Sequence, residues 1–311
     1  MHHAQVNRVL DFIEEHLSES LSVARLAKVA HASKFHFHRV FHRTVGESPH
    51  GYVRRIRVER AASMLLHSPL SITEIAHACG FSSSATFAKA FRALLGMTAT
   101  AWREGGHRTK GDVERKKRQT LRTERKAYRI SARYFDRVQP TWRYTMTTKP
   151  LTGTIEVQQR PPLEVAYVRH VGPYAGNSAL FQKLFGQIAA WAGARNLLGP
   201  DAQFLTIAHD DPAVTDESKR RISVCVTVPD TTEASGEIGR MTVTGGTYAV
   251  GHFEVDVDRV ADAWDAVIAH WLPESGYQPD ARHCYEVSLN DPREHPEGKL
   301  ILDICVPVRP G

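Results

Sequence analysis

The sequence predicts a two-domain α+β protein, in which an all-α tandem helix-turn-helix domain is followed by a duplicated βαββ domain. Two internal repeats predict this fold. A helix-turn-helix pattern occurs over residues 26–41 and again over residues 75–91. A second, longer repeat fills residues 155–309. Net charge also changes sign along the chain, so the two parts are expected to have different partners.

The second helix of each helix-turn-helix copy carries two phenylalanines four residues apart. Phe37 pairs with Phe41 in the first copy, and Phe87 pairs with Phe91 in the second. Side chains at positions i and i+4 lie on the same face of a helix, so both pairs are expected to face the core. The polar side chains between them are then left outward, toward a partner.

The turn inside each copy has its own signals. Gly80 suits a turn that needs a positive φ, and His31 holds the equivalent place in the first copy, where histidine is one of the residues that tolerate it. Ser33 and Ser82 are expected to cap the second helices. A helix over about residues 52–67 is expected to hold the two copies at fixed spacing.

The formal net charge of +6 is unevenly distributed. Residues 1–106 hold 13 Lys+Arg against 8 Asp+Glu, residues 107–149 hold 14 against 4, and residues 150–311 hold 13 against 22. A polyanion is therefore the expected partner of the first part only, and phosphate contacts supply much of the affinity for DNA. The basic run 115–118 is either a solvated linker or a DNA contact, and both interpretations stay open.

The N-terminal repeat resembles a known family. Residues 1–104, with the run from Gly80 through Phe91 to Gly96, resemble the DNA-binding domain of the AraC/XylS transcription regulators. In that family each second helix enters the major groove and its outward residues read bases. The resemblance implies double-stranded DNA as a partner and these base-reading positions: Phe35, His38, Arg39, Arg43, Ser83, Ser84, Thr86 and Lys89.

The two expected reading helices differ in size of side chain. Ser84 and Ala85 are small where the family often places larger amides. This departure favours phosphate contact over base reading by the second helix.

Each unit of the longer repeat predicts a β-rich segment, a helix and two further strands. Residues 179–194 and 259–272 carry apolar side chains at helical spacing, which predicts the helix of each unit. Each helix is expected to cover one face of a sheet. The opposite faces would then form a groove between the two halves, where ligand pockets often lie.

Four segments of this half carry a second resemblance. They span residues 170–174, 245–250, 271–277 and 285–287, and they resemble the GyrI-like small-molecule-binding domain over residues 153–311. That family binds amphipathic, often cationic compounds through a central Glu and surrounding aromatic side chains. The resemblance implies a ligand site made of Glu286, Tyr167, Trp191, Tyr248 and Trp271.

Strand alternation predicts where Glu286 points. Tyr285, Val287 and Leu289 share one face of the strand, which we expect to be the helix-covered face. Glu286 is then expected on the other face, lining the groove, where its carboxylate pairs with a ligand cation and aromatic rings add cation–π attraction. The alternative is an exposed strand Glu paired with a surface Arg; the family position favours the ligand site.

No cofactor, metal site or catalytic set is expected. His38 and His42 are one helical turn apart, but no Cys or carboxylate nearby completes a metal set. The four cysteines are scattered and indicate buried thiols in a reducing cytoplasm. No apolar run is long enough to span a bilayer, and no signal sequence is seen, so no membrane partner is expected.

These observations predict a DNA-binding domain over 1–106, a basic linker over 107–152 and a small-molecule-binding domain over 153–311. The predicted function is a cytoplasmic, ligand-responsive transcription regulator whose partners are double-stranded DNA, a small-molecule effector and RNA polymerase. Two alternatives belong to other classes: a hydrolase of a reactive compound that uses Glu286 as general base, and a domain that sequesters its ligand without signalling. The fused DNA-binding domain favours sensing.

Overall fold

The structure, a computed structural model, describes residues 3–106, 134–135, 142–143, 151, 153–211, 214–234, 236–280 and 282–311. The basic run 115–118 lies outside the described residues. So does the rest of the predicted linker, apart from residue 151 and two short strands, β1 (Tyr134–Phe135) and β2 (Trp142–Arg143). The chain divides into an N-terminal helical unit and a C-terminal sheet-rich unit, and each is described by itself.

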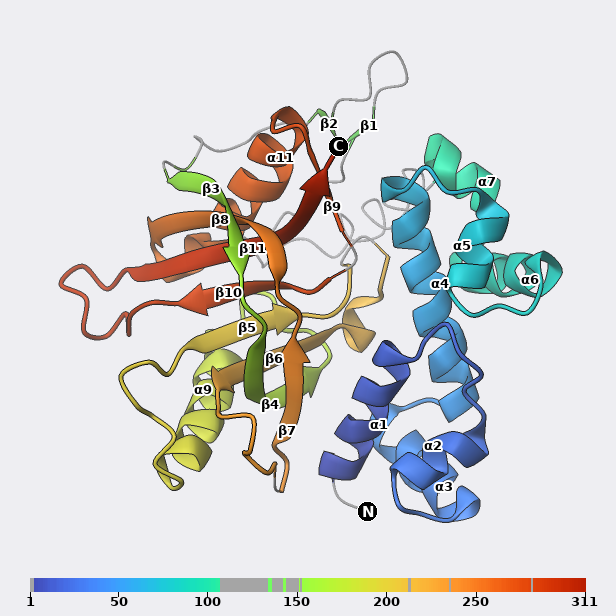
Figure 1. The fold of residues 1–311 in the computed structure, drawn as a ribbon, viewed down its shortest axis with the longest axis horizontal. Coiled ribbons are helices and arrows are strands. Elements are labelled where there is room, and N and C mark those ends of the chain that lie inside the picture. The colour runs from blue at the N-terminus through green and yellow to red at the C-terminus, as the bar shows by residue number, and fades with distance from the viewer. Residues whose placement is uncertain are drawn as a thin grey trace, which may run out of the picture. The chain divides into compact units, whose positions relative to one another are not determined.

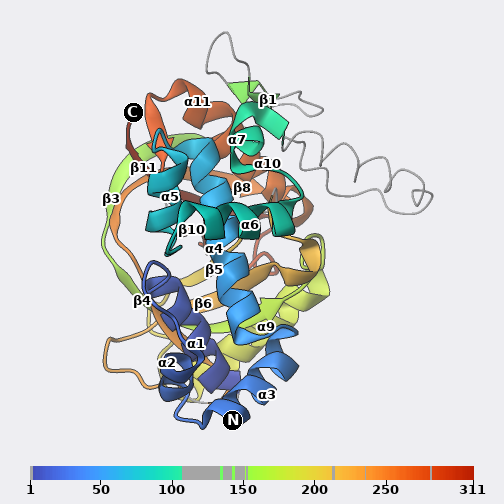
Figure 2. The same cartoon turned by 90° about the vertical axis from the view of Figure 1, so that its right-hand side faces the viewer.

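The N-terminal unit consists of two helix-turn-helix modules joined by a long helix. Its helices are α1 (His3–Glu15), α2 (Val23–Val29), α3 (Lys34–Val45), α4 (Pro49–His67), α5 (Ile72–Ala78), α6 (Ser84–Leu95) and α7 (Ala99–Ala101), followed by a π-helical turn over Trp102–Gly106. Figure 2 shows α4 running from the first module, α1–α3, to the second, α5–α7. The expected connecting helix is confirmed.

The first module begins and ends its recognition helix with the expected local signals. Ser33 caps α3 by accepting a hydrogen bond from the His36 backbone N at 3.3 Å. His31, in the turn before it, has the predicted positive φ, 49°. Gly46 ends α3 in the left-handed conformation, which a residue without Cβ adopts at least cost.

The second module repeats this arrangement with one correction. Gly80 has the predicted positive φ of 79°. Ser83, and not Ser82, caps α6, accepting from the Thr86 backbone N at 3.2 Å. The prediction was wrong because the turn between α5 and α6 is one residue longer than that between α2 and α3, so the hydroxyl at the helix start shifts by one position.

Each module has its own apolar core, and α4 contributes to both. Phe37 and Phe41 are fully buried in the first core, and Phe87 and Phe91 are buried in the second, as predicted. The start of α4 adds Tyr52, Val53 and Ile56 to the first core, and its later turns add Val58, Ala61, Ala62 and Leu65 to the second. One helix that is buried on both sides ties the modules into a single unit.

The turn of the second module also lies against the first. A Cβ built on Gly80 would lie 2.4 Å from the Leu17 carbonyl oxygen and 2.8 Å from Nη2 of Arg57. Arg57, from α4, donates to the carbonyl oxygens of Leu17 at 2.9 Å and Glu19 at 2.5 Å. Only glycine fits at this close approach, so the spacing of the two modules depends on it.

The C-terminal unit is one large curved sheet with two helices on it (Figure 1). Its strands are β3 (Thr154–Arg160), β4 (Leu163–Val171), β5 (Phe204–Ala208), β6 (Arg221–Thr227), β7 (Gly239–Val243), β8 (Gly246–Val255), β9 (Tyr277–Pro279), β10 (Cys284–Ser288) and β11 (Leu300–Pro310). Its main helices are α9 (Ser178–Gly193) and α10 (Val260–Asp265), the latter continued by a π-helical segment (Ala266–Trp271) and by α11 (Leu272–Glu274). Two single turns of 3-10 helix span Glu217–Lys219 and Val257–Arg259.

The two βαββ repeats exchange their edge strands. The strand order is β3-β8-β11-β10-β5-β6-β4-β7, so β3 of the first repeat pairs with β8 of the second, and β7 pairs with β4. Short turns nevertheless join β3 to β4 and β7 to β8, which requires the sheet to curl. A Cβ on Gly245 would lie 2.6 Å from the Pro162 N and 2.7 Å from the Arg160 carbonyl oxygen. The two connections therefore touch where they cross.

The two faces of this sheet have different coverings. Helix α9 packs over β4 and β6, and α10 with its continuation packs over β8 and β11. The central strands β5 and β10 lie between these two pairs. The opposite face holds a core of strand residues: Val165, Tyr167, Leu205, Ile207, Cys225, Val243, Tyr248, Val250, Tyr285, Val287 and Cys305.

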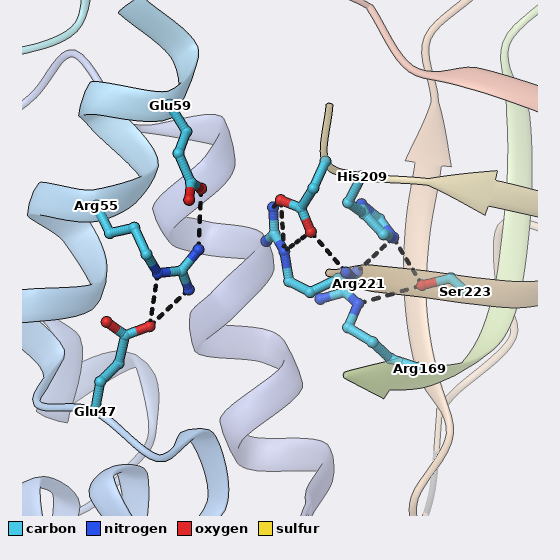
Figure 3. Close-up of polar contacts among 8 residues, drawn as sticks. Glu47, Arg55, Glu59, Arg169, His209, Arg221 and Ser223 are labelled. Carbon is cyan, nitrogen blue, oxygen red and sulfur yellow. Dashed lines mark hydrogen bonds and ion pairs between the residues drawn. The ribbon is translucent and has the colours of Figure 1, made fainter. Parts of the chain in front are cut away.

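A polar cluster fixes the ends of β4, β5 and β6 (Figure 3). Arg221 and Asp210, each with a side chain only 3% exposed, form a buried ion pair. On neighbouring strands Arg169 donates through Nε to the Ser223 hydroxyl at 3.2 Å, and His209 Nε2 lies 2.8 Å from the same hydroxyl. Buried charges are tolerated when paired in this way, and removing one partner would be strongly destabilising.

Among the described residues, every helix is too short or too polar to cross a lipid bilayer.

Candidate functional site

The outward face of α3 is open and strongly basic. While Phe37 and Phe41 are buried, the side chains of Phe35, His38 and Arg39 are exposed, and Phe35 is 91% exposed. The helix sequence contains one Lys, two Arg and three His residues and no acidic residue. All four positions proposed for base reading on α3, Phe35, His38, Arg39 and Arg43, therefore lie together on its solvent side.

The outward face of α6 is also open but carries hydroxyl groups. The positions proposed for DNA contact, Ser83, Ser84, Thr86 and Lys89, are all exposed. Ser83 caps the helix and lies 2.8 Å, oxygen to oxygen, from the Thr86 hydroxyl, and the Ser84 hydroxyl lies 3.5 Å from that of Thr73. Much of the hydrogen-bonding capacity at the start of α6 is thus used within the module, which leaves Lys89 as the charged group of this set.

Glu286 lies on the helix-covered face of the sheet. Glu286 belongs to β10 and pairs with Thr206 on β5 and with Ile304 on β11. Trp264, on α10, donates through its indole Nε1 to Glu286 Oε2 at 3.0 Å. Because β5 and β10 lie between the strands that carry the two helices, the carboxylate faces the space between α9 and α10.

This position corrects the face predicted for Glu286. Tyr285 and Val287 do share one face of the strand, opposite Glu286, but they lie in the core built from strand residues. The helices cover the face of Glu286. Alternation separates two sets of side chains and does not say which set a helix covers, and the curled sheet places its large apolar residues on the inside of the curve. Leu289, beyond β10, is 47% exposed.

The surroundings of Glu286 favour a neutral carboxyl group more than water does. Burial raises its pKa, and the hydrogen bond from Trp264 counteracts part of that rise. The residue as a whole nevertheless keeps partial solvent exposure. Tyr174 lies close enough for the Glu286 charge to contribute to its own raised pKa, of which burial is the main cause. A carboxylate beside aromatic rings can accept a cation that loses its hydration shell.

The structure does not bring the predicted aromatic residues together around Glu286. Tyr167 and Tyr248 are fully buried on the opposite face, where Tyr248 contacts Tyr285 with ring centroids 5.4 Å apart. Trp191 and Trp271 lie on the helices and are partly exposed. Arg195 lies over the Trp191 ring at 4.6 Å, and Trp271 stacks on Tyr277 with ring centroids 6.2 Å apart.

Sequence reasoning missed two aromatic residues near the carboxylate. Trp264 was assigned only to the apolar face of its helix, and Tyr174 was noted only as part of a family motif. Tyr174 contacts Phe181 edge-on at 6.5 Å, and Phe185 contacts Phe204 at 6.1 Å. Trp264 could have been found from the sequence. Its helix was expected to cover the sheet that carries Glu286, and a buried indole N–H normally needs an acceptor such as a carboxylate.

Both domains match known families. Residues 153–309 match the GyrI-like small molecule binding domain, and residues 26–105 match a helix-turn-helix domain. The probable transcriptional regulator LumQ of Photobacterium leiognathi is 37% identical over 100 residues, which cover 32% of this chain and 40% of LumQ. A DNA gyrase inhibitor of Yersinia enterocolitica is 31% identical over 153 residues, which cover 48% of this chain and 93% of that protein.

Solved structures resemble the N-terminal part as well. The AraC-type transcriptional regulator from Chromobacterium violaceum has a TM-score of 0.31 and 28% identity, covering 32% of this chain and 89% of that one. The chain belongs to the GyrI-like family through a domain that fills half of it, and it carries in front of that domain a helix-turn-helix domain of the AraC type. A DNA-binding domain joined to a small-molecule-binding domain is the composition of a ligand-responsive transcription regulator.

Proposed function

We propose that the chain regulates transcription in response to a small molecule. Residues 1–106 bind double-stranded DNA by placing α3 and α6 in adjacent major grooves, and residues 153–311 bind an amphipathic cation at Glu286. The main support is that one chain carries both parts. Its N-terminal domain exposes α3 and α6, of which α3 is strongly basic, and its C-terminal domain matches a small-molecule-binding family and places Glu286 on the face of the sheet that carries the helices. The relative LumQ, named a probable transcriptional regulator, is consistent with this role.

RNA polymerase as a partner, a cytoplasmic location and a basic linker over residues 107–152 complete this proposal. A regulator acts on transcription either by contacting the polymerase or by blocking it. Two reading helices on one chain also remove the need for a dimer on a palindrome. The isolated fragment 1–106 should therefore bind a single asymmetric DNA site as a monomer, and binding only as a dimer on a palindrome would contradict the tandem mechanism.

Arg39 is the sharpest single test of the DNA interface. It lies outward on α3, one helical turn before Arg43. If it reads a guanine, Arg39→Ala should weaken specific binding by about 1–3 kcal/mol and relax selectivity at that base pair. Unchanged affinity at fixed salt, in a variant with the wild-type melting temperature, would remove Arg39 from the interface.

The charge of Glu286 is the matching test of the ligand site. A thermal-shift screen of amphipathic cations and neutral aromatics supplies probe compounds. Glu286→Gln should weaken the cations and spare neutral compounds of similar size, whereas Glu274→Gln, at an exposed acid of the same domain, should change neither. Calorimetric titration decides this, and an equal loss for both classes of compound would contradict charge pairing.

The raised pKa of Glu286 adds a pH signature. Binding of a cation requires the carboxylate, and burial shifts protonation of this group to higher pH than for an ordinary glutamate. Affinity for cations should therefore fall as pH is lowered through that raised pKa, while Glu286→Gln should bind with no such dependence. Release or recruitment of DNA by the same compounds would support sensing, and DNA occupancy indifferent to bound ligand would support sequestration instead.

A further inference from the structure

Each recognition helix packs against the helical segment downstream of it through an aromatic pair at equivalent positions. In the first module the Phe41 ring meets Tyr52 of α4 edge-on, with centroids 5.6 Å apart and planes at 78°. In the second module Phe91 meets Trp102 with centroids 5.9 Å apart and planes at 83°. The two modules therefore place their recognition helices with one geometry, and what holds that geometry in each can be compared directly.

The first module holds it with a buried ionic network (Figure 3). Arg55, on α4, donates through Nε and Nη2 to Glu47 Oε1 at 2.8 and 2.6 Å, and through Nη1 to Glu59 Oε2 at 2.9 Å. Its side chain is 5% exposed, against 17% for Glu47 and 11% for Glu59. The guanidinium lies 5.0 Å from the centroid of the Tyr52 ring. The network thus contacts the aromatic pair itself.

Glu47 is the member that connects this network to α3. It lies in the turn between α3 and α4, directly after Gly46, whose φ of 81° ends the recognition helix. Arg55 therefore bonds at once to the turn and to α4, in the fixed fork geometry of a guanidinium. The bonds to Glu47 therefore tie the turn that follows α3 to the second turn of α4.

The second module has no ionic counterpart at the matching positions, which hold Met97 and Gly105. Met97 packs against the apolar core instead. The contacts here go to backbone carbonyl oxygens: Trp102 donates through Nε1 to that of Ala62 on α4 at 3.0 Å, and Arg103 donates to those of Leu65 at 3.4 Å and Leu70 at 2.6 Å. Equivalent aromatic packing is thus accompanied by an ion-pair network in one module and by donors to backbone carbonyl oxygens in the other.

We propose that Arg55, with Glu47 and Glu59, is a positioning network that sets the orientation of α3 on DNA. Base reading requires a side chain to be held within about 0.5 Å and 10–20° of its productive geometry. Removing the guanidinium removes the cation that Glu47 and Glu59 share, so the charge-assisted bonds between the turn and α4 are lost. Selectivity in the half-site read by α3 depends on this network, and selectivity in the half-site read by α6 does not. This inference rests on the proposed function.

The test uses the full chain and a duplex selected from a random DNA pool by the wild-type protein. The α3 half-site is the set of base pairs at which Arg39→Ala loses discrimination, and the other selected base pairs form the α6 half-site. Single base-pair changes in the α3 half-site should each cost the wild-type protein roughly 5- to 150-fold in affinity, the equivalent of about 1–3 kcal/mol per mismatch. Changes in the α6 half-site should cost less, because the small side chains of α6 favour phosphate contact. Arg55→Lys keeps the charge but cannot bridge both carboxylates. It should lose most discrimination in the α3 half-site and leave the α6 half-site within about twofold, at a temperature where it is folded.

Arg60→Gln supplies the matched control. Arg60 lies on the same helix and is exposed, so this variant removes one positive charge without touching the network. It should change affinity for all duplexes alike. If Arg55→Lys retains discrimination in both half-sites, or loses it equally in both, the positioning network is wrong. If the wild-type chain selects no sequence at all, the proposed DNA-binding function fails first, and the two failures are therefore distinguishable.

Discussion

The two helix-turn-helix modules reach the same packing by different local chemistry. The first has a histidine in the left-handed turn, a single serine cap on α2 and an ionic network at α4. The second has a glycine in that turn, a capping box on α5 and a neutral indole hydrogen bond. The two copies therefore have the same arrangement of helices, although different interactions hold the helices in place. Each difference can be broken separately.

Gly80→Ala should have the largest effect. The added Cβ would overlap the Leu17 carbonyl oxygen and the Arg57 guanidinium, and the positive φ adds strain of its own. We expect a loss of about 3 kcal/mol or more in the free energy of unfolding, measured by urea denaturation. Gly96→Ala is the control, because Gly96 has a φ of 76° and nothing within 4 Å of a Cβ. It should cost only about 1–2 kcal/mol, and equal losses would contradict the close approach between modules.

Trp102→Phe should come next. It keeps an aromatic ring against Phe91 but removes the donor to the Ala62 carbonyl oxygen, which is then buried without that partner. That oxygen keeps its helical donor in α4, so the variant loses one hydrogen bond, about 0.5–1.5 kcal/mol, together with part of the packing of the larger ring. Neither group titrates near neutral pH, so thermal melts at pH 5 and pH 8 should give the same loss. A loss confined to one pH would mean that the tie in the second module is not neutral.

Ser71→Ala probes the capping box that only the second module has. Ser71 accepts from the Glu74 backbone N at 3.2 Å, and its own N donates to Glu74 Oε2 at 2.7 Å. We expect a loss of about 1 kcal/mol, close to that of Ser22→Ala in the first module, because each variant removes one side-chain cap and the bond from the backbone N of residue 71 to Glu74 survives. An unchanged free energy of unfolding in urea denaturation would contradict the cap.

The same box predicts a pH dependence with a definite sign. Hydrogen bonds from the Ser71 side chain and backbone lower the pKa of Glu74 in the folded chain. Its contribution is therefore present above the pKa of an unfolded glutamate, about 4.3, and is lost as pH falls through the lower folded value. Glu74→Gln should remove this part of the acid dependence of stability, measured by denaturation between pH 3 and pH 6. An unchanged acid profile would contradict the box.

His31→Gly should have the smallest effect, and it is a gain. His31 occupies the left-handed region at a φ of 49°, which glycine adopts without strain. Relief of that strain exceeds the entropy lost by ordering a glycine, so we expect the free energy of unfolding to rise by about 0.5 kcal/mol. A shift of the thermal midpoint upward checks it, and a downward shift would show that the histidine side chain is itself stabilising.

Much of the architecture could be predicted from the sequence because it is written in local spacing. The phenylalanine pairs located both recognition helices, and the positive φ of Gly80 and His31 followed from the turn pattern. Ser82 was predicted to cap α6 in place of Ser83, because one extra residue in the turn does not change the helical spacing of the apolar residues. The prediction placed Glu286 on the wrong face of the sheet. Strand alternation is a local pattern, whereas which face a helix covers depends on contacts between segments far apart in the sequence.

The network of Arg55 shows a second limit. Glu47, Arg55 and Glu59 look like ordinary charged residues of a turn and a solvated helix, and only tertiary packing buries them. Trp264 likewise became part of the ligand site because α10 brings its indole to Glu286. Side chains whose role depends on a partner from another element leave no periodic signal in the sequence.

The exchanged edge strands of the C-terminal unit have a consequence for synthesis on the ribosome. Thr154 of β3 pairs opposite His252 of β8, so the first strand of this unit must wait until about 100 more residues have been made. At 5–20 residues per second the wait is roughly 5–20 s, far longer than a hairpin needs to form. During that time β3 presents an unpaired edge, which is a hazard for pairing with other chains. A nascent chain arrested between β6 and β8 should therefore bind holdase chaperones strongly and lose that binding once β8 has emerged.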